Sequence, residues 1–292
     1  MKGIFSALIN TFNKDGSPNI EALKQVIDHN INVCGVDGLY VNGSTGESFN
    51  MPHADKITIL RETAKHVDGR IDLIAQIGCN IMEEIYELAD VAAECGYKAV
   101  SAVTPYYFVY SKDEIIAHYY KIADYSKIPF LVYNIPIRTS VSLTRDDFRK
   151  LLSYPNIAGV KFTANDFYLL DNIREDFSDA LIYSGFDEML LSAAVLRTDG
   201  AIGSTYNIIG HWAKDVLRAV NRSDLAAART RQRQINTVVS MLLNSGSIMA
   251  ALKAVFEIYG IPVGECRLPM APTTLEQRKA AAEVAAYIKA NN

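Results

Sequence analysis

The chemistry that this sequence offers centres on a lysine inside an apolar segment, NIAGVKFTAND at residues 156–166. Alternate side chains of a strand point to opposite faces, so Lys161 shares one face with small or apolar neighbours and the bulkier side chains pack under helices. Its own face holds Ile157, Gly159 and Thr163, and the opposite face holds Ala158, Val160 and Phe162. We therefore expect Lys161 to point into the core.

Burial disfavours an ammonium ion and lowers its pKa, which leaves part of the population as a neutral, nucleophilic amine. Such an amine forms carbinolamines and Schiff bases with carbonyl compounds. Two structural alternatives compete with this interpretation. Lys161 would then pair with a carboxylate across the core, or it would lie at the solvated end of its strand.

Tyr133 is the second candidate catalytic residue, near the end of the segment PFLVYNIP at residues 129–136. Tyr133 is the fourth residue after Pro129, and Lys161 is the fourth residue after Ile157. If the two strands are neighbours, both side chains lie at one height, where a phenol can serve as general acid and base. The structural alternative is a packed tyrosine whose hydroxyl is satisfied.

Two further segments place polar groups where strands end. GSTGES, residues 43–48, leaves backbone amides free to hold a carboxylate or a phosphate, although a plain turn with a Ser or Thr cap fits equally well. SGFDEM, residues 184–189, is followed by GAIGSTYN, residues 200–207. Asp187 and Glu188 would repel a phosphate there, whereas two carboxylates bind a polyol well.

Eight short apolar segments alternate with helical patterns along the chain. They are residues 3–9, 38–43, 71–78, 99–105, 129–136, 157–163, 180–185 and 200–205. Eight strand and helix units favour a (β/α)8 TIM barrel, and the competing open sheet would require a GxGxxG segment after its first strand. In such a barrel the carboxyl ends of the strands carry the chemistry.

The helices follow from local patterns. Residues 55–67 and 81–95 have apolar positions at helical spacing, and Ser17 with Pro18 predicts the start of the first helix. We expect residues 1–211 to form the barrel core and residues 212–292 to form a closing helix with a C-terminal helical extension, all within one domain. The extension would pack on the side of the barrel or build an oligomer contact.

Composition limits the classes of partner. The 292 residues carry a net charge of −4 without a basic cluster, so nucleic acid is not an expected partner. Polar residues interrupt the N-terminal apolar run before a signal peptide or membrane span can form, which predicts a cytoplasmic protein without a membrane partner. The four cysteines form no CxxC pair and are expected to be reduced and buried, and no histidine spacing predicts a metal site.

Together these motifs resemble one family. GSTGES, TPYY, YNIP, GVKFT and GFDE followed by GSTYN occur in the order and at the spacing of the N-acetylneuraminate lyase and dihydrodipicolinate synthase family, from the first strand through the eighth. GFDE and GSTYN are similar to the sialic acid lyase branch. The resemblance implies a cofactor-free Schiff-base aldolase that cleaves N-acetylneuraminate reversibly to N-acetylmannosamine and pyruvate.

The resemblance also implies roles for single residues. Lys161 would form the imine with pyruvate, Tyr133 would relay protons, and Ser44 with Thr45 would hold the pyruvate carboxylate. The hydroxyl chain of the sugar acid would contact Thr163, Gly185, Asp187, Glu188 and Ser204. In family members a tyrosine after the fourth strand reaches a neighbouring subunit, so Tyr106 or Tyr107 would do so in a homotetramer.

Arg138 departs from this pattern, because YNIPIRTS places an arginine where the synthase branch binds the carboxylate of an aldehyde substrate. A surface role for Arg138 is equally open. A synthase-like or other pyruvate-dependent aldolase is therefore the alternative activity. A barrel that binds a keto acid without turnover is the alternative from a different class.

Overall fold

Parallel strands close into one barrel in the computed structural model, which describes all 292 residues. Each strand pairs with the next along the chain, and β8 pairs with β1. The strands are β1 (Gly3–Ala7), β2 (Gly38–Val41), β3 (Asp72–Gln76), β4 (Ala99–Val103), β5 (Phe130–Asn134), β6 (Ile157–Phe162), β7 (Leu181–Ser184) and β8 (Gly200–Gly203). The predicted TIM barrel is confirmed, and every strand lies inside its predicted segment.

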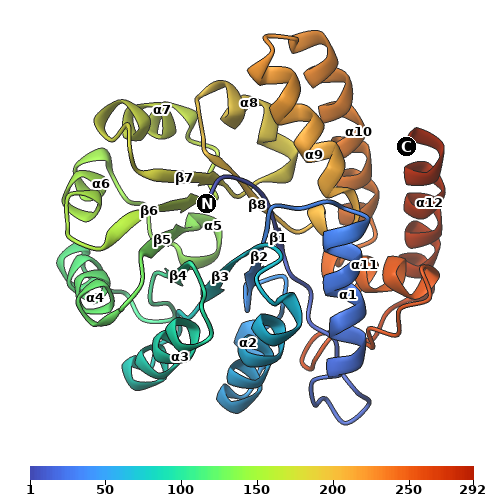
Figure 1. Ribbon diagram of the computed structural model, residues 1–292, viewed down its shortest axis with the longest axis horizontal. Coiled ribbons are helices and arrows are strands. Elements are labelled where there is room, and N and C mark those ends of the chain that lie inside the picture. Colours follow the sequence, from blue (N-terminus) through green and yellow to red (C-terminus); the bar gives the residue numbers. More distant parts are fainter.

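Helices surround the strands, and the C-terminal helices gather on the side of α1 and α9 (Figure 1). The helices before β8 are α1 (Ile20–Asn32), α2 (His53–Val67), α3 (Met82–Glu94), α4 (Lys112–Tyr125), α5 (Pro136–Thr139), α6 (Arg145–Leu152), α7 (Phe167–Asp176) and α8 (Leu190–Val195). Those after it are α9 (Tyr206–Asn221), α10 (Leu225–Asn244), α11 (Ile248–Ile258) and α12 (Leu275–Asn291). The extension packs on the side of the barrel, and the division proposed at residue 211 falls inside α9.

The first helix starts two residues later than Ser17 and Pro18 predicted. Asn19 is the cap residue, and its side-chain oxygen accepts a hydrogen bond from the Ala22 amide. Pro18 instead forms an isolated bridge with Phe12. The prediction was wrong because Asn19 offers a capping oxygen directly before the first helical residue.

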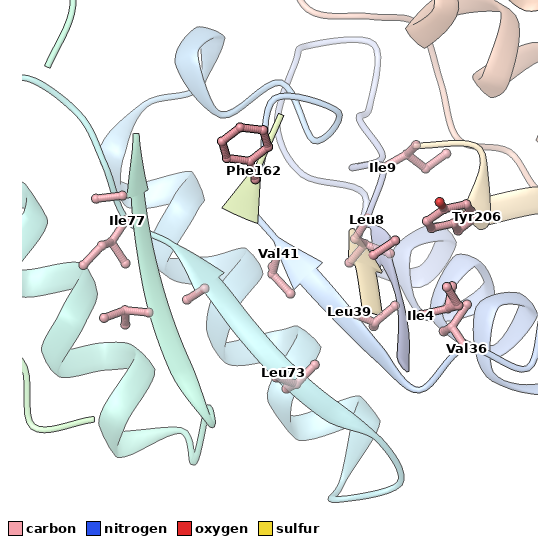
Figure 2. Close-up of a cluster of buried hydrophobic side chains, with 14 of the residues drawn as sticks. Ile4, Leu8, Ile9, Val36, Leu39, Val41, Leu73, Ile77, Phe162 and Tyr206 are labelled. Carbon is pink, nitrogen blue, oxygen red and sulfur yellow. The ribbon is translucent and has the colours of Figure 1, made fainter. Parts of the chain in front are cut away.

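The core has two layers. Sixty-seven buried residues fill the space between strands and helices, and Figure 2 shows part of this layer, including Ile4, Leu39 and Leu73 on β1, β2 and β3. A separate cluster of 11 buried residues fills the inside of the barrel and includes Tyr40 and Tyr133. The interior therefore presents aromatic rings to any polar group that enters it.

The register of β5 and β6 contains a bulge. Phe130 pairs with Ile157 and Leu131 pairs with Gly159, so Ala158 is an extra residue on β6. Ile157 consequently belongs to the outer layer and Ala158 packs against the inner one, opposite to the predicted faces. Beyond the bulge the predicted alternation holds.

Candidate active site

Lys161 lies inside the barrel and is 4% exposed. Its Nζ is 4.0 Å from the ring centroid of Tyr40 and 4.0 Å from that of Tyr133. Desolvation lowers the pKa of Lys161 to about 7, and the charge of Asp187 partly opposes this shift. In a substantial fraction of the molecules, Lys161 is thus a neutral amine near neutral pH. Its side chain forms no ion pair with a carboxylate, contrary to the first structural alternative.

Tyr133 is the register partner of Lys161 across β5 and β6. Burial raises the pKa of its phenol, while the hydroxyls of Ser44 and Thr163 and the charge of Arg138 act to lower it. Thr163 Oγ1 is buried and has no partner that meets hydrogen-bond geometry, so it remains available to a ligand. The phenol thus has hydroxyl neighbours from two other strand ends.

The loop 43–48 after β2 brings amides and hydroxyls to the same place. Thr45 Oγ1 lies 2.7 Å from Ser204 Oγ, which links this loop to the end of β8. The amides of Gly46 and Glu47 donate to carbonyls within the loop, whereas those of Ser44 and Thr45 donate to no backbone carbonyl. Two free amides beside two hydroxyls suit a carboxylate.

Asp187 is buried at the start of the short helical turn Asp187–Met189. Its Oδ2 accepts from the Thr205 amide at 2.8 Å and from Thr205 Oγ1 at 2.6 Å. Burial, assisted by the charge of Glu188, raises the pKa of Asp187 to about 6, against the lowering effect of Thr205 and Lys161. Asp187 therefore ionises close to neutral pH.

Gly185 permits a close approach between β7 and β6. A Cβ at this position would lie 1.7 Å from Thr163 Oγ1, which excludes any side chain. The glycine thus keeps the threonine hydroxyl and Asp187 on one wall.

All eleven predicted site residues line one cavity of about 770 Å³. They are Ser44, Thr45, Tyr106, Tyr107, Tyr133, Lys161, Thr163, Gly185, Asp187, Glu188 and Ser204. Arg138 lines it too, with an exposed side chain on α5. The structure therefore gathers residues that the sequence separates by up to 160 positions, Ser44 and Ser204 being the most distant.

Both tyrosines after β4 border the cavity of their own chain. Tyr106 packs edge-on against Phe49 with ring centroids 5.3 Å apart. The Tyr106 amide donates to the Asn80 side-chain oxygen, and the Asn80 side-chain nitrogen donates to the Tyr106 carbonyl. Tyr107 is 88% exposed and has a left-handed φ of 79°. Of the two, Tyr107 projects its side chain into solvent.

Sequence reasoning missed part of the cavity. Tyr40 contacts the lysine amine, yet it does not stand out in the sequence from other strand residues. Thr205 lies at the rim after the eighth strand as expected, but its hydrogen bond to Asp187 was not predicted. The far wall is apolar and comes from α10 and α11, through Val239, Leu243, Ile248 and Met249. Helical periodicity alone gave no signal that these residues face a cavity.

Outside the cavity, the four cysteines are free as predicted, and three of them are buried, whereas Cys95 is half-buried. No group of three or more His, Cys, Asp or Glu side chains is arranged to hold a metal ion. No single helix is long and apolar enough to cross a membrane, and α10 with α11 meets that test only as a pair bent by 109°. The cytoplasmic location stays a prediction.

The fold and the cavity define a (β/α)8-barrel protein whose strand ends present a buried amine, a phenol and a loop with two free amides. The chain belongs to the dihydrodipicolinate synthetase family, whose model matches residues 1–290.

Individual relatives extend this result. The chain is 41% identical over 284 residues to an N-acetylneuraminate lyase from Clostridium perfringens, covering 97% of this chain and 98% of the relative. A Clostridium difficile protein solved in complex with mannosamine superposes with a TM-score of 0.95 at 41% identity, covering 98% of each chain. The structure of N-acetylneuraminate lyase from Fusobacterium nucleatum complexed with pyruvate superposes with a TM-score of 0.93 at 40% identity, covering 99% of this chain and 97% of the other chain.

Proposed function

We propose that the protein is a Schiff-base aldolase that cleaves N-acetylneuraminate reversibly to N-acetylmannosamine and pyruvate. The observation that carries the proposal is the neutral-amine environment of Lys161 beside Tyr133, in the same cavity as the free amides of loop 43–48. The names of the relatives support the choice of sugar acid, and the Fusobacterium nucleatum and Clostridium difficile complexes support pyruvate and an amino sugar as ligands.

The reaction begins when the Lys161 amine attacks the keto carbon of the sugar acid. Loss of water from the carbinolamine gives a protonated imine, which acts as an electron sink. The carbon at the far end of the breaking bond leaves as the aldehyde, and Tyr133 relays the proton of that carbon's hydroxyl. The phenol oxygen accepts this proton while the phenol's own proton passes on towards the enamine carbon. The bonding electrons form an enamine, which regains a proton and is hydrolysed to pyruvate and free lysine.

Each half of the substrate has its own wall. Ser44 and Thr45 hold the carboxylate of the keto acid, because they line the same cavity as the lysine and their amides donate to no backbone carbonyl. The hydroxyl chain lies against Gly185, Asp187, Glu188 and Ser204, with Thr163 beside them. No metal or nucleotide takes part, since the imine supplies the electron sink.

Reductive trapping tests the proposal. The protein is incubated with N-acetylneuraminate alone, reduced with borohydride and mapped by peptide mass, with pyruvate alone and a Lys161→Arg variant in parallel. A pyruvyl adduct on Lys161 from the sugar acid is the expected result. If only pyruvate is trapped, Lys161 is the imine-forming residue but N-acetylneuraminate is not the substrate. If neither compound is trapped, the protein is a barrel that binds a keto acid without turnover.

A second candidate reaction is condensation of pyruvate with an aldehyde that itself carries a carboxylate. Arg138 favours it, since its side chain lines the cavity and its charge acts on Tyr133. Aspartate semialdehyde is the probe. Turnover with it that is lost in Arg138→Gln would support this candidate over the sugar acid.

We further propose a homotetramer in which Tyr106 or Tyr107 serves the site of a neighbouring subunit. The loop after β4 supports this, because Tyr107, Phe108 and Val109 are 88%, 67% and 103% exposed and form an apolar tip. Light scattering of the purified protein gives the mass, and a Val109→Asp variant is expected to dissociate the assembly.

A further inference from the structure

A buried ion pair connects the predicted carboxylate-binding loop to the C-terminal extension. Glu47 stands at the end of loop 43–48, and Lys253 comes from α11. Lys253 Nζ lies 2.6 Å from Glu47 Oε1, and the two side chains are 2% and 0% exposed. Charges removed from water to this degree are tolerated only where each compensates the other.

Further contacts complete the surroundings of this pair. Glu47 Oε2 accepts from the Arg267 amide at 2.7 Å, and Lys253 Nζ donates to the Glu265 carbonyl at 2.9 Å. The ammonium also lies 4.4 Å from the ring centroid of Phe12. Residues 265–267, which follow α11, thus hold both ends of the pair, and neither side chain reaches the reacting atoms.

The backbone of Glu47 needs such an anchor. Its φ of 60° and ψ of 27° lie in the left-handed region, which residues with a side chain rarely adopt. Its amide donates to the Ser44 carbonyl at 3.0 Å, so the conformation of Glu47 determines where Ser44 and Thr45 lie. If Glu47 relaxed to a negative φ, its hydrogen bond to the Ser44 carbonyl would be lost and the two free amides would be displaced.

We propose that Glu47 and Lys253 are positioning residues whose buried ion pair holds loop 43–48 in the conformation that binds the keto-acid carboxylate. This inference rests on the proposed function for its kinetic consequence. The pair joins loop 43–48 to α11 and is held by residues that follow α11, and no hydrogen bond or ion pair connects it to Asp187 or Glu188, which line the cavity. Its loss should therefore weaken binding of pyruvate and leave binding of the aldehyde nearly unchanged.

The variants are Glu47→Gln, which keeps the shape of the side chain, and Lys253→Met. Arg218→Gln is the control, because it removes an ion pair to Asp215 at the surface of α9, with no contact to loop 43–48 or to residues 265–267. Steady-state kinetics in the condensation direction give separate KM values for pyruvate and for N-acetylmannosamine. We expect the pyruvate KM to rise about tenfold or more, equivalent to about 1.4 kcal/mol, with the aldehyde KM within about threefold.

Hydrogen exchange supplies a readout that needs no substrate. The amides of Gly46, Glu47 and Ser48 bond within the loop, and we expect them to exchange about tenfold faster in Glu47→Gln and at the unchanged rate in Arg218→Gln. Unchanged exchange in folded Glu47→Gln overturns the inference, as does an equal rise of both KM values. If the wild-type protein is not trapped by pyruvate, the proposed function fails, but the exchange result still decides the role of the pair.

Discussion

Tyr133 and Lys161 face each other as register partners on neighbouring strands, with the lysine Nζ 4.0 Å from the centre of the tyrosine ring. A ring face attracts an ammonium ion, but it does not offset the loss of water as a paired carboxylate would. The lysine pKa consequently falls to about 7. This single relationship places a nucleophile and a proton carrier on one wall of the cavity.

The rate of imine formation should follow the titration of Lys161. The amine is protonated below its pKa and nucleophilic above it, so we expect the rate with pyruvate to rise from pH 5.5 and level off above about pH 8. Rapid sampling with cyanoborohydride and mass measurement reports the rate. A rate that still climbs steeply towards pH 10 would contradict the lowered pKa.

Replacing Lys161 with Met should stabilise the fold at neutral pH. The unfolded chain holds the lysine proton up to about pH 10.5, whereas the folded chain releases it near pH 7. Burial of the ammonium therefore lowers the free energy of unfolding fully below about pH 7, and this cost decreases to zero as the pH rises to about 10.5. We expect a gain of about 5 kcal/mol at pH 6 that disappears above pH 10.5, since the pKa falls from 10.5 to about 7 on folding and one pKa unit is about 1.4 kcal/mol.

Urea unfolding at the two pH values measures the stability difference. Lys24→Met is the control, because Lys24 forms only a surface pair with Glu21. A gain that does not change with pH would assign the effect to packing and not to charge.

Removing the phenol hydroxyl of Tyr133 should separate proton transfer from imine formation. Tyr133→Phe keeps the ring over Lys161, so we expect pyruvate still to be trapped, while kcat for cleavage falls about 100- to 1,000-fold. Tyr183→Phe is the matched control, since Tyr183 lies in the same interior cluster and donates to the Met1 carbonyl. Equal losses of kcat in both variants would argue against a role in proton transfer.

Thr205 should set the ionisation of Asp187. Thr205→Val removes the 2.6 Å hydroxyl bond and keeps the backbone one, so we expect the pKa of Asp187 to rise above about 6. The acid limb of kcat/KM for the sugar acid would shift to higher pH, and the value at pH 6.5 would fall about fivefold, as expected for loss of one such bond. Thr205→Ser keeps the donor, so identical pH profiles for the Val and Ser variants would disprove the link.

Local pattern predicted most of the fold and the core of the candidate site. Strand alternation placed Lys161 inside the barrel, and counting along the two strands placed it opposite Tyr133. The count began from Pro129, whereas Ile157 actually pairs with Phe130. The extra residue Ala158 in the bulge compensates for this difference of one position, so Lys161 still pairs with Tyr133. Such patterns succeed because side-chain direction in a strand is a local property. They were wrong about Ile157 and Ala158 because a bulge depends on the partner strand.

The sequence by itself determined the barrel, the inward lysine and the strand ends that carry polar groups. Only the tertiary structure decided the pKa values of Lys161 and Asp187, the aromatic contact with Tyr40, the apolar wall from α10 and α11, and the pair between Glu47 and Lys253. Desolvation and charge pairing depend on atoms that meet in space, and periodicity along the chain does not record which distant residues will meet.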